Sequence, residues 1–374
     1  MTGQRHIPAL DGLRGLAVVM VFVFHYGGGM QSSVRAMRVF GAVNKGGWSG
    51  VTLFFILSGF LITGILWDSF EEPRWWRNFY VRRTLRIFPL YFGTLVLVLL
   101  AAAAVGTFRQ AMSTIWVPAL FLQNMPYLID RIDHLASPLA LFHFWSLAVE
   151  EQFYLIWPFL LVWQKSQRSA RRLCVAVFVV CFMFRVLMVT FDPNWRQYIE
   201  FILSRGGELA AGGWLAICYR GPEWGRVERF APYAAVAGLI GFVASGIGGG
   251  SFELNNPFSV AVGIPCATVF FAALLVLSLR PGMVQRFASW GWLRWTGGIS
   301  YGIYVFHMLF VAQFASIARA VFGEQNHTRL VAGEFLVAAA GSVLAAWLSF
   351  HFFETPFLRM KGRFSASASR VKAS

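Results

Sequence analysis

The chain has 374 residues, of which 57% are hydrophobic and only 13% are charged. A soluble domain carries about 25% charged residues, and the mean hydropathy here is +0.59. The formal net charge is +15, but the basic residues lie in short loops between apolar runs, a pattern that orients membrane helices. Composition therefore predicts an all-α, polytopic transmembrane helical bundle and disfavours a nucleic-acid partner.

Ten apolar runs have about the 20 residues that a helix needs to cross a bilayer. They span residues 9–28, 48–67, 85–105, 144–163, 172–191, 199–219, 231–248, 258–279, 297–318 and 330–353. An eleventh stretch, 112–125, is shorter and contains Pro118, Gln123 and Asn124. The first run has no small-residue cleavage site after it, so we expect an anchoring helix rather than a cleaved signal.

Loop charge predicts the orientation of these runs. Residues 74–86 and 165–172 are strongly basic and are expected in the cytoplasm. Only an even number of crossings joins them, so 112–125 is predicted to re-enter from the outer side or to lie there. Ten spans with both termini in the cytoplasm follow. Residues 1–360 form the membrane domain, and 361–374 form a basic, disordered cytoplasmic tail.

The first run carries Asp11, Arg14 and His25 along one stripe, because eleven residues correspond to three helical turns plus about 20°. An ionisable residue facing lipid costs about 2.5–3.5 kcal/mol, so such residues normally face the bundle interior and mark function. Arg14 has two compatible interpretations, an ion pair with Asp11 and a cation that binds an anionic donor. It lies about 16 Å from His25 along the axis.

The run 144–163 carries Glu150 and Glu151. His25 and Glu150 fall at similar depth if their helices adjoin. A histidine beside a carboxylate is suited to general-base catalysis on a hydroxyl. A simple hydrogen bond from His25 across helices is an equally open interpretation.

Three further arginines, Arg82, Arg83 and Arg86, lie in the first basic loop. Arg82 and Arg86 share a helical face, and guanidinium groups suit phosphate. Taken alone, lipid headgroup binding and topology control explain them better. Ser58 and Gly59 favour close helix packing over a nucleophilic serine.

Other polar residues interrupt the later apolar runs: Arg205, Glu208, His307 and Glu354. Glu354 is near the inner end of the last run, where solvent exposure would explain it. The four cysteines fall within apolar runs, without a CxxC pair or clustered histidines. We therefore expect packing cysteines and no metal site.

Six stretches together resemble the acyltransferase-3 family of integral membrane acyltransferases. In chain order they are LDGLRGLAVVMVFVFH, GVTLFFILSGFLIT, FYVRRTLRIFPLY, FWSLAVEEQFYLIWP, ISYGIYVFHMLF and FFETPF, and they extend from residue 7 to about 360. The resemblance implies transfer of an acyl group, most often acetyl from acetyl-CoA, to a hydroxyl of a sugar, glycan or similar small acceptor. It also implies a multi-pass protein of the bacterial inner membrane.

By position, His25 is similar to the essential histidine of the family and Arg14 to its paired arginine. Glu150 matches the first glutamate of the WSLxxE string, and the three loop arginines match the basic loop that would hold acetyl-CoA. Supporting roles are implied for Asp11, Trp145, Ser146, Glu151, Tyr154, Arg205, Ser300 and His307. The rival hypothesis is a transporter or flippase that uses the same buried charges for substrate passage.

Overall fold

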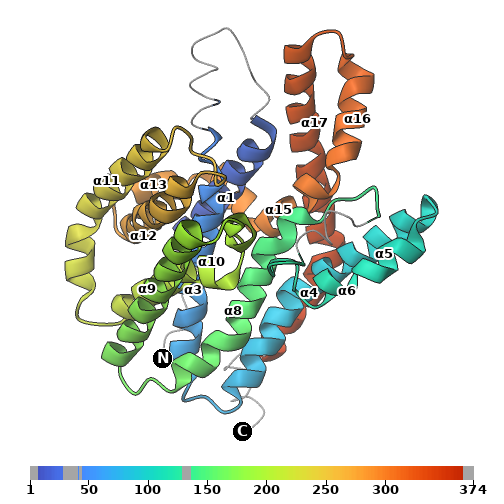
Figure 1. Ribbon diagram of the computed structural model, residues 1–374. Coiled ribbons are helices and arrows are strands. Elements are labelled where there is room, and N and C mark those ends of the chain that lie inside the picture. The colour runs from blue at the N-terminus through green and yellow to red at the C-terminus, as the bar shows by residue number, and fades with distance from the viewer. Residues whose placement is uncertain (1–6, 28–40, 42–43, 129–135, 365–374) are drawn as a thin grey trace.

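The computed structural model describes residues 7–27, 41, 44–128 and 136–364, and every regular element in this part of the chain is a helix (Figure 1). The longer helices are α1 (Pro8–Gly27), α3 (Ser49–Ser69), α4 (Trp75–Ala104), α8 (Trp145–Val162), α9 (Gln167–Phe191), α10 (Ile202–Tyr219), α11 (Trp224–Gly248), α12 (Ile264–Leu279), α15 (Ser300–Leu309), α16 (Val311–Phe322) and α17 (His327–Leu348). The shorter ones are α5 (Phe108–Thr114), α6 (Trp116–Ala119), α13 (Met283–Ala288), α14 (Gly291–Gly298), α18 (Thr355–Met360) and the single turns η1 (Phe142–Phe144), η2 (Trp195–Tyr198), η3 (Ser259–Gly263), η4 (Ser349–Glu354) and η5 (Lys361–Phe364).

Each of the ten predicted runs is helical over most of its length, so the all-α multi-pass prediction is confirmed. Among the described residues, seven helices are long and apolar enough to cross a membrane, or eight if the bent pair α15–α16 is one span. Helices α8 and α10 fall outside that group, because each carries ionisable residues among its 18 positions. The count of ten spans therefore stays a prediction.

The ninth predicted run, 297–318, is not one straight helix. It divides into α15 and α16, which meet at an angle of 69°. The stretch 112–125 forms the two short helices α5 and α6 and an irregular segment, none of which is long enough to span a bilayer. That part of the chain agrees with the predicted non-spanning piece.

The connections predicted to be cytoplasmic gather at one end of the molecule (Figure 1). Arg220 after α10 is 2.6 Å from Asp68 at the end of α3. Arg171 in α9 pairs with Glu223 at 2.6 Å. The turn η5 returns to the same end, where the Arg77 guanidinium lies over the Phe364 ring. The rest of the predicted disordered tail, 365–374, lies outside the described residues, and the side that faces the cytoplasm stays a prediction from charge.

Helices α3 and α10 cross at close contact in the centre of the bundle. A Cβ atom added to Gly59 would lie 1.9 Å from the Leu209 carbonyl oxygen, and one added to Gly212 would lie 2.0 Å from that of Ile56. Only glycine permits such an approach of two backbones. The predicted packing role of the Ser58–Gly59 pair is therefore confirmed for Gly59.

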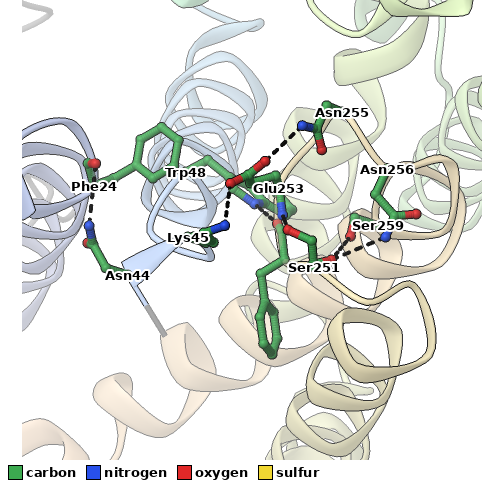
Figure 2. A network of polar contacts seen from close by, with 10 residues as sticks. Phe24, Asn44, Lys45, Trp48, Ser251, Glu253, Asn255, Asn256 and Ser259 are labelled. Atoms are coloured by element: carbon green, nitrogen blue, oxygen red, sulfur yellow. Dashed lines mark hydrogen bonds and ion pairs between the residues drawn. The ribbon is translucent and has the colours of Figure 1, made fainter. Parts of the chain in front are cut away.

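At the opposite end, polar contacts join the start of α3 to the connection between α11 and α12 (Figure 2). Lys45 pairs with Glu253 at 2.8 Å, and the Trp48 indole donates to a backbone carbonyl of that connection at 2.7 Å. Asn44 donates to the carbonyl of Phe24 at 3.4 Å. These contacts fix the chain next to the last turn of α1, where His25 lies.

A buried ion cluster ties α9 to α10. Arg185 and Arg205 share the carboxylate of Glu208, with nitrogen–oxygen distances of 3.5 and 3.3 Å. All three side chains are at most 1% exposed, and Arg185 also donates to the Ser204 carbonyl at 2.7 Å. Sequence reasoning did not single out Arg185, although an arginine inside the apolar run 172–191 indicates a buried partner.

We predict that replacing Glu208 with leucine destabilises the protein by about 3–5 kcal/mol, since two buried guanidinium groups would lose their counter-charge. Thermal unfolding of the purified protein in detergent measures the effect. The control is Glu223→Gln, which breaks the partly exposed pair with Arg171 and should cost about 1 kcal/mol or less. Equal shifts in the two variants would contradict the structural importance of the buried cluster.

Candidate active site

Two histidines from distant parts of the chain meet near the end of the bundle opposite the basic connections, which is the end predicted to face outward and is called the outer end below. His25 is in the last turn of α1 and His307 is in α15, and their rings lie 5.0 Å apart between centroids. The Nε2 atom of His307 is 3.3 Å from Nδ1 of His25. The sequence prediction named both residues but did not pair them.

The backbone sets the tautomer of His25. Its Nδ1 atom is 2.9 Å from the carbonyl oxygen of Val21. A carbonyl oxygen only accepts, so Nδ1 carries the hydrogen in the neutral ring and Nε2 keeps its lone pair. Within the described residues Nε2 makes no hydrogen bond. The ring thus offers a free basic nitrogen, which is what a general base needs.

A second layer of side chains surrounds the histidine pair. His143 is 2% exposed, donates from Nε2 to the Val305 carbonyl at 3.0 Å and packs edge-on against the His307 ring at 5.1 Å. The Tyr304 hydroxyl donates to the His143 carbonyl at 2.7 Å and contacts the hydroxyl of Ser146. Ser146 is therefore joined to the histidine pair through Tyr304, which sequence reasoning did not single out.

Glu150 does not pair with His25, which corrects the arrangement expected from depth. Its Oε2 atom accepts a hydrogen bond from Tyr154 at 3.0 Å, and the Tyr154 hydroxyl contacts that of Ser58. The reason is rotation about α8: depth along a helix does not determine which neighbour a side chain faces. Glu150 thus belongs to the middle of the bundle.

The end of the site nearest the basic connections, predicted to face the cytoplasm and called the inner end below, is positively charged. Arg14 is 3.8 Å from Asp11, so the predicted i,i+3 ion pair forms. Arg14 also interacts electrostatically with Arg83, Arg86 and Glu150, which places these groups around one region. The Arg83 guanidinium lies over the Tyr154 ring at 4.9 Å.

The basic stretch 74–86 is helical rather than a loop, because α4 begins at Trp75, and arginine is a good helix former. Arg82 is exposed, whereas Arg83 and Arg86 are partly buried. Arg83 and Arg86 are thus the more buried members of the trio, and the role of all three in binding the donor stays a prediction.

These groups form one polar column through the bundle, which we define as His25, His307, Tyr304, Ser146, Glu150, Tyr154 and Arg83. Successive members are joined by a hydrogen bond, a ring contact or one helical turn. Polar groups in a bilayer core are costly unless they are paired or serve a ligand. The column therefore connects the basic inner end to the histidine pair.

Arg205 lies next to this column in an aromatic enclosure. Its guanidinium carbon is 5.6 Å from the ring centres of both Phe55 and Trp145 and 5.9 Å from that of Trp48. Its Nη2 atom is 3.4 Å from the Thr52 hydroxyl, and its buried Nη1 has no hydrogen-bond partner among the described residues. An unsatisfied buried donor of this kind is available to a ligand oxygen.

The remaining predicted residues have more local contacts. Ser300 is 1% exposed and donates to the Gly297 carbonyl at 2.8 Å. Glu151 has a buried oxygen without a hydrogen bond in the described residues. Glu354 is only 7% exposed and accepts from Ser349 at 3.0 Å, so its expected solvent exposure is wrong.

The described residues contain no group of three or more His, Cys, Asp or Glu side chains arranged to hold a metal ion. The three histidines near the outer end are instead bonded to backbone carbonyls. The four cysteines, Cys174, Cys181, Cys218 and Cys266, are free thiols, in agreement with the expected packing role.

Residues 7–352 match the family described as an acyltransferase domain. The peptidoglycan O-acetyltransferase OatA of Listeria monocytogenes is 25% identical over 370 residues, covering 94% of this chain and 56% of that protein. YrhL of Bacillus subtilis, a proposed peptidoglycan O-acetyltransferase, is 30% identical over 397 residues, covering 98% of this chain and 57% of that protein.

The chain thus spans a little over half the length of these two curated relatives. The O-acetyltransferase OatA of Staphylococcus aureus is 28% identical over 201 residues, which cover 50% of this chain and 30% of that protein. No solved structure matches the chain.

The backbone of the histidine pair is held by Tyr26, whose hydroxyl donates to the His307 carbonyl at 2.5 Å. We predict that Tyr26→Phe destabilises the protein by about 0.5–1.5 kcal/mol through loss of this buried bond, measured as a lower midpoint of thermal unfolding in detergent. Tyr233→Phe is the control, because Tyr233 is 72% exposed. A Tyr26 variant as stable as that control would contradict the contact.

Proposed function

The chain belongs to the acyltransferase-3 family of integral membrane acyltransferases, and we propose that it moves an acetyl group from acetyl-CoA to a hydroxyl of a cell-wall glycan. The observation that carries this proposal is the polar column, which links a cluster of arginines to a histidine with a free basic nitrogen. The names of the Listeria and Bacillus relatives support a peptidoglycan acceptor. A multi-pass chain with bacterial relatives suits the bacterial inner membrane.

The donor would bind at the inner end. Arg14, Arg83 and Arg86 lie together there, and guanidinium groups bind phosphate oxygens through paired hydrogen bonds. Arg14 and His25 are about 16 Å apart along α1, so one compact ligand does not touch both. Acetyl-CoA fits this separation, because its thioester is at the end of a long flexible arm and its phosphates are at the other end.

The acceptor would react at the outer end. Nε2 of His25 takes the proton of the acceptor hydroxyl while the hydroxyl oxygen attacks the thioester carbonyl carbon. The C–S bond then breaks, the thiolate leaves with the proton returned from His25, and the acetyl group forms an ester with the acceptor. The unpartnered N–H of Arg205 is suited to stabilise the negative charge that develops on the carbonyl oxygen.

Direct transfer is the route we propose. The hydroxyl of Ser58 contacts that of Tyr154, which donates to Glu150, and this group lies next to Arg83 at the inner side of the column. An acyl-enzyme route needs a nucleophile within reach of its base. His25 makes its side-chain contact with His307 instead, so Ser58 and His25 do not act as a nucleophile–base pair.

We predict that His25→Ala lowers acetyl transfer at least about 100-fold, because general-base catalysis contributes roughly 10² to 10⁴. Radiolabelled acetyl-CoA and peptidoglycan glycan strands are incubated with membrane vesicles that contain the protein, and both labelled glycan and free CoA thiol are measured. His351→Ala is the control, because His351 is exposed and outside the polar column.

Retained transfer in the His25 variant would contradict the mechanism. Acetyl-CoA left intact by the unaltered protein would contradict the enzyme and favour a flippase.

We predict that Arg83→Gln raises the KM for acetyl-CoA about tenfold, through loss of one charge-assisted contact to phosphate. The neighbouring Arg82→Gln should change it less, because Arg82 is exposed while Arg83 contacts Tyr154. Initial rates of thiol release against acetyl-CoA concentration measure both constants. Equal effects at 82 and 83 would indicate a diffuse basic surface rather than a shaped donor site.

A further inference from the structure

We infer that His307 is a positioning residue for His25: it accepts the Nδ1 hydrogen of His25 and so holds Nε2 toward the acceptor hydroxyl. The inference rests on the proposed function, since it assumes that His25 is the base. It assigns to a neutral imidazole the role that a carboxylate has beside the histidine of a serine-protease triad.

The backbone also fixes the tautomer of His307. Its Nδ1 atom is 2.6 Å from the carbonyl oxygen of Tyr304, so Nδ1 carries the hydrogen and Nε2 has the lone pair. That lone pair is the atom that faces His25 Nδ1 at 3.3 Å. Donor and acceptor therefore match, and the Nδ1 hydrogen of His25 is shared between Val21 and His307.

The surroundings hold the His307 ring in this orientation. The residue is 1% exposed, and its own carbonyl accepts from Tyr26 in α1 at 2.5 Å. The bond from its Nδ1 atom to the Tyr304 carbonyl at 2.6 Å sets the angle of the ring, whereas the His143 ring touches it edge-on at 5.1 Å without a hydrogen bond. A ring held in this way can impose its orientation on the partly exposed His25.

The contact with His307 also gives the protonated form of His25 an acceptor. When Nε2 of His25 accepts the hydroxyl proton, the ring becomes an imidazolium with two N–H donors. The Nδ1 donor then still has the Val21 carbonyl and the His307 lone pair as acceptors. Without His307, the backbone carbonyl is the one acceptor left to Nδ1 in the described residues. His25 would then keep a single orienting bond, and rotation of its ring away from the acceptor would be opposed less strongly.

The test compares His307→Leu, which removes the acceptor, with His307→Gln, which restores an acceptor oxygen at similar reach. His143→Gln is the matched control, because His143 is equally buried and touches the same ring but makes no hydrogen bond to His25. Rates of transfer from radiolabelled acetyl-CoA to glycan strands give kcat, and thiol release gives the KM for acetyl-CoA. Thermal unfolding in detergent reports the stability of each variant.

We expect kcat to fall about 100-fold in His307→Leu with the KM for acetyl-CoA unchanged, because an orienting partner acts on the base and not on donor binding. His307→Gln should recover to within about tenfold of the unaltered protein. His143→Gln should lose stability but keep most of its kcat.

A leucine variant with normal kcat, a glutamine variant no better than leucine, or a parallel loss in His143→Gln would each overturn the inference. If His307→Leu is too unstable to measure, His307→Phe, which keeps a buried aromatic ring but lacks the acceptor, takes its place in the same comparison. An active His307→Leu alongside an inactive His25→Ala overturns the inference alone. Activity in both variants overturns the proposed function as well.

Discussion

The hydrogen bond from the His25 ring to the Val21 carbonyl is the interaction on which the proposed chemistry depends. A helix backbone cannot turn its carbonyl away, so this contact forces one tautomer and leaves Nε2 as the basic atom. Nε2 of His307, which lies in α15, accepts the same hydrogen. The position of the base is thus set by α1, and its orientation is set where α1 and α15 meet.

The second constraint is the distance between the arginines that would bind the donor and the histidine that would act as the base. The arginines that suit phosphate lie at the end of the bundle where the basic connections gather, and the histidine pair lies near the other end. Between them, each polar side chain of the column has a partner that lowers the cost of its burial, as with Glu150 and Tyr154. The buried ion cluster of Arg185, Arg205 and Glu208 supports the adjoining helices in the same way.

Much of this arrangement is predictable from sequence, because it depends on spacing within one helix. The positions of the helices, the ion pair of Asp11 with Arg14 and the close approach at Gly59 all follow from local pattern. The pairing of His25 with His307 does not, since 282 residues separate these two histidines and no local pattern indicates which helix faces meet. The expected pairing of Glu150 with His25 failed for that reason, and sequence did not distinguish Arg82 from Arg83 because the start of α4 was placed ten residues late.

The measurement that tests the central claim most directly is a structure of the protein in lipid nanodiscs with a non-hydrolysable acetyl-CoA analogue. The account predicts phosphate density against Arg14, Arg83 and Arg86, and the acyl carbon close to His25 Nε2, with His25 Nδ1 still bonded to Val21 and His307. An analogue whose acyl group ends away from His25, or a His25 ring rotated so that Nε2 meets His307, would contradict it.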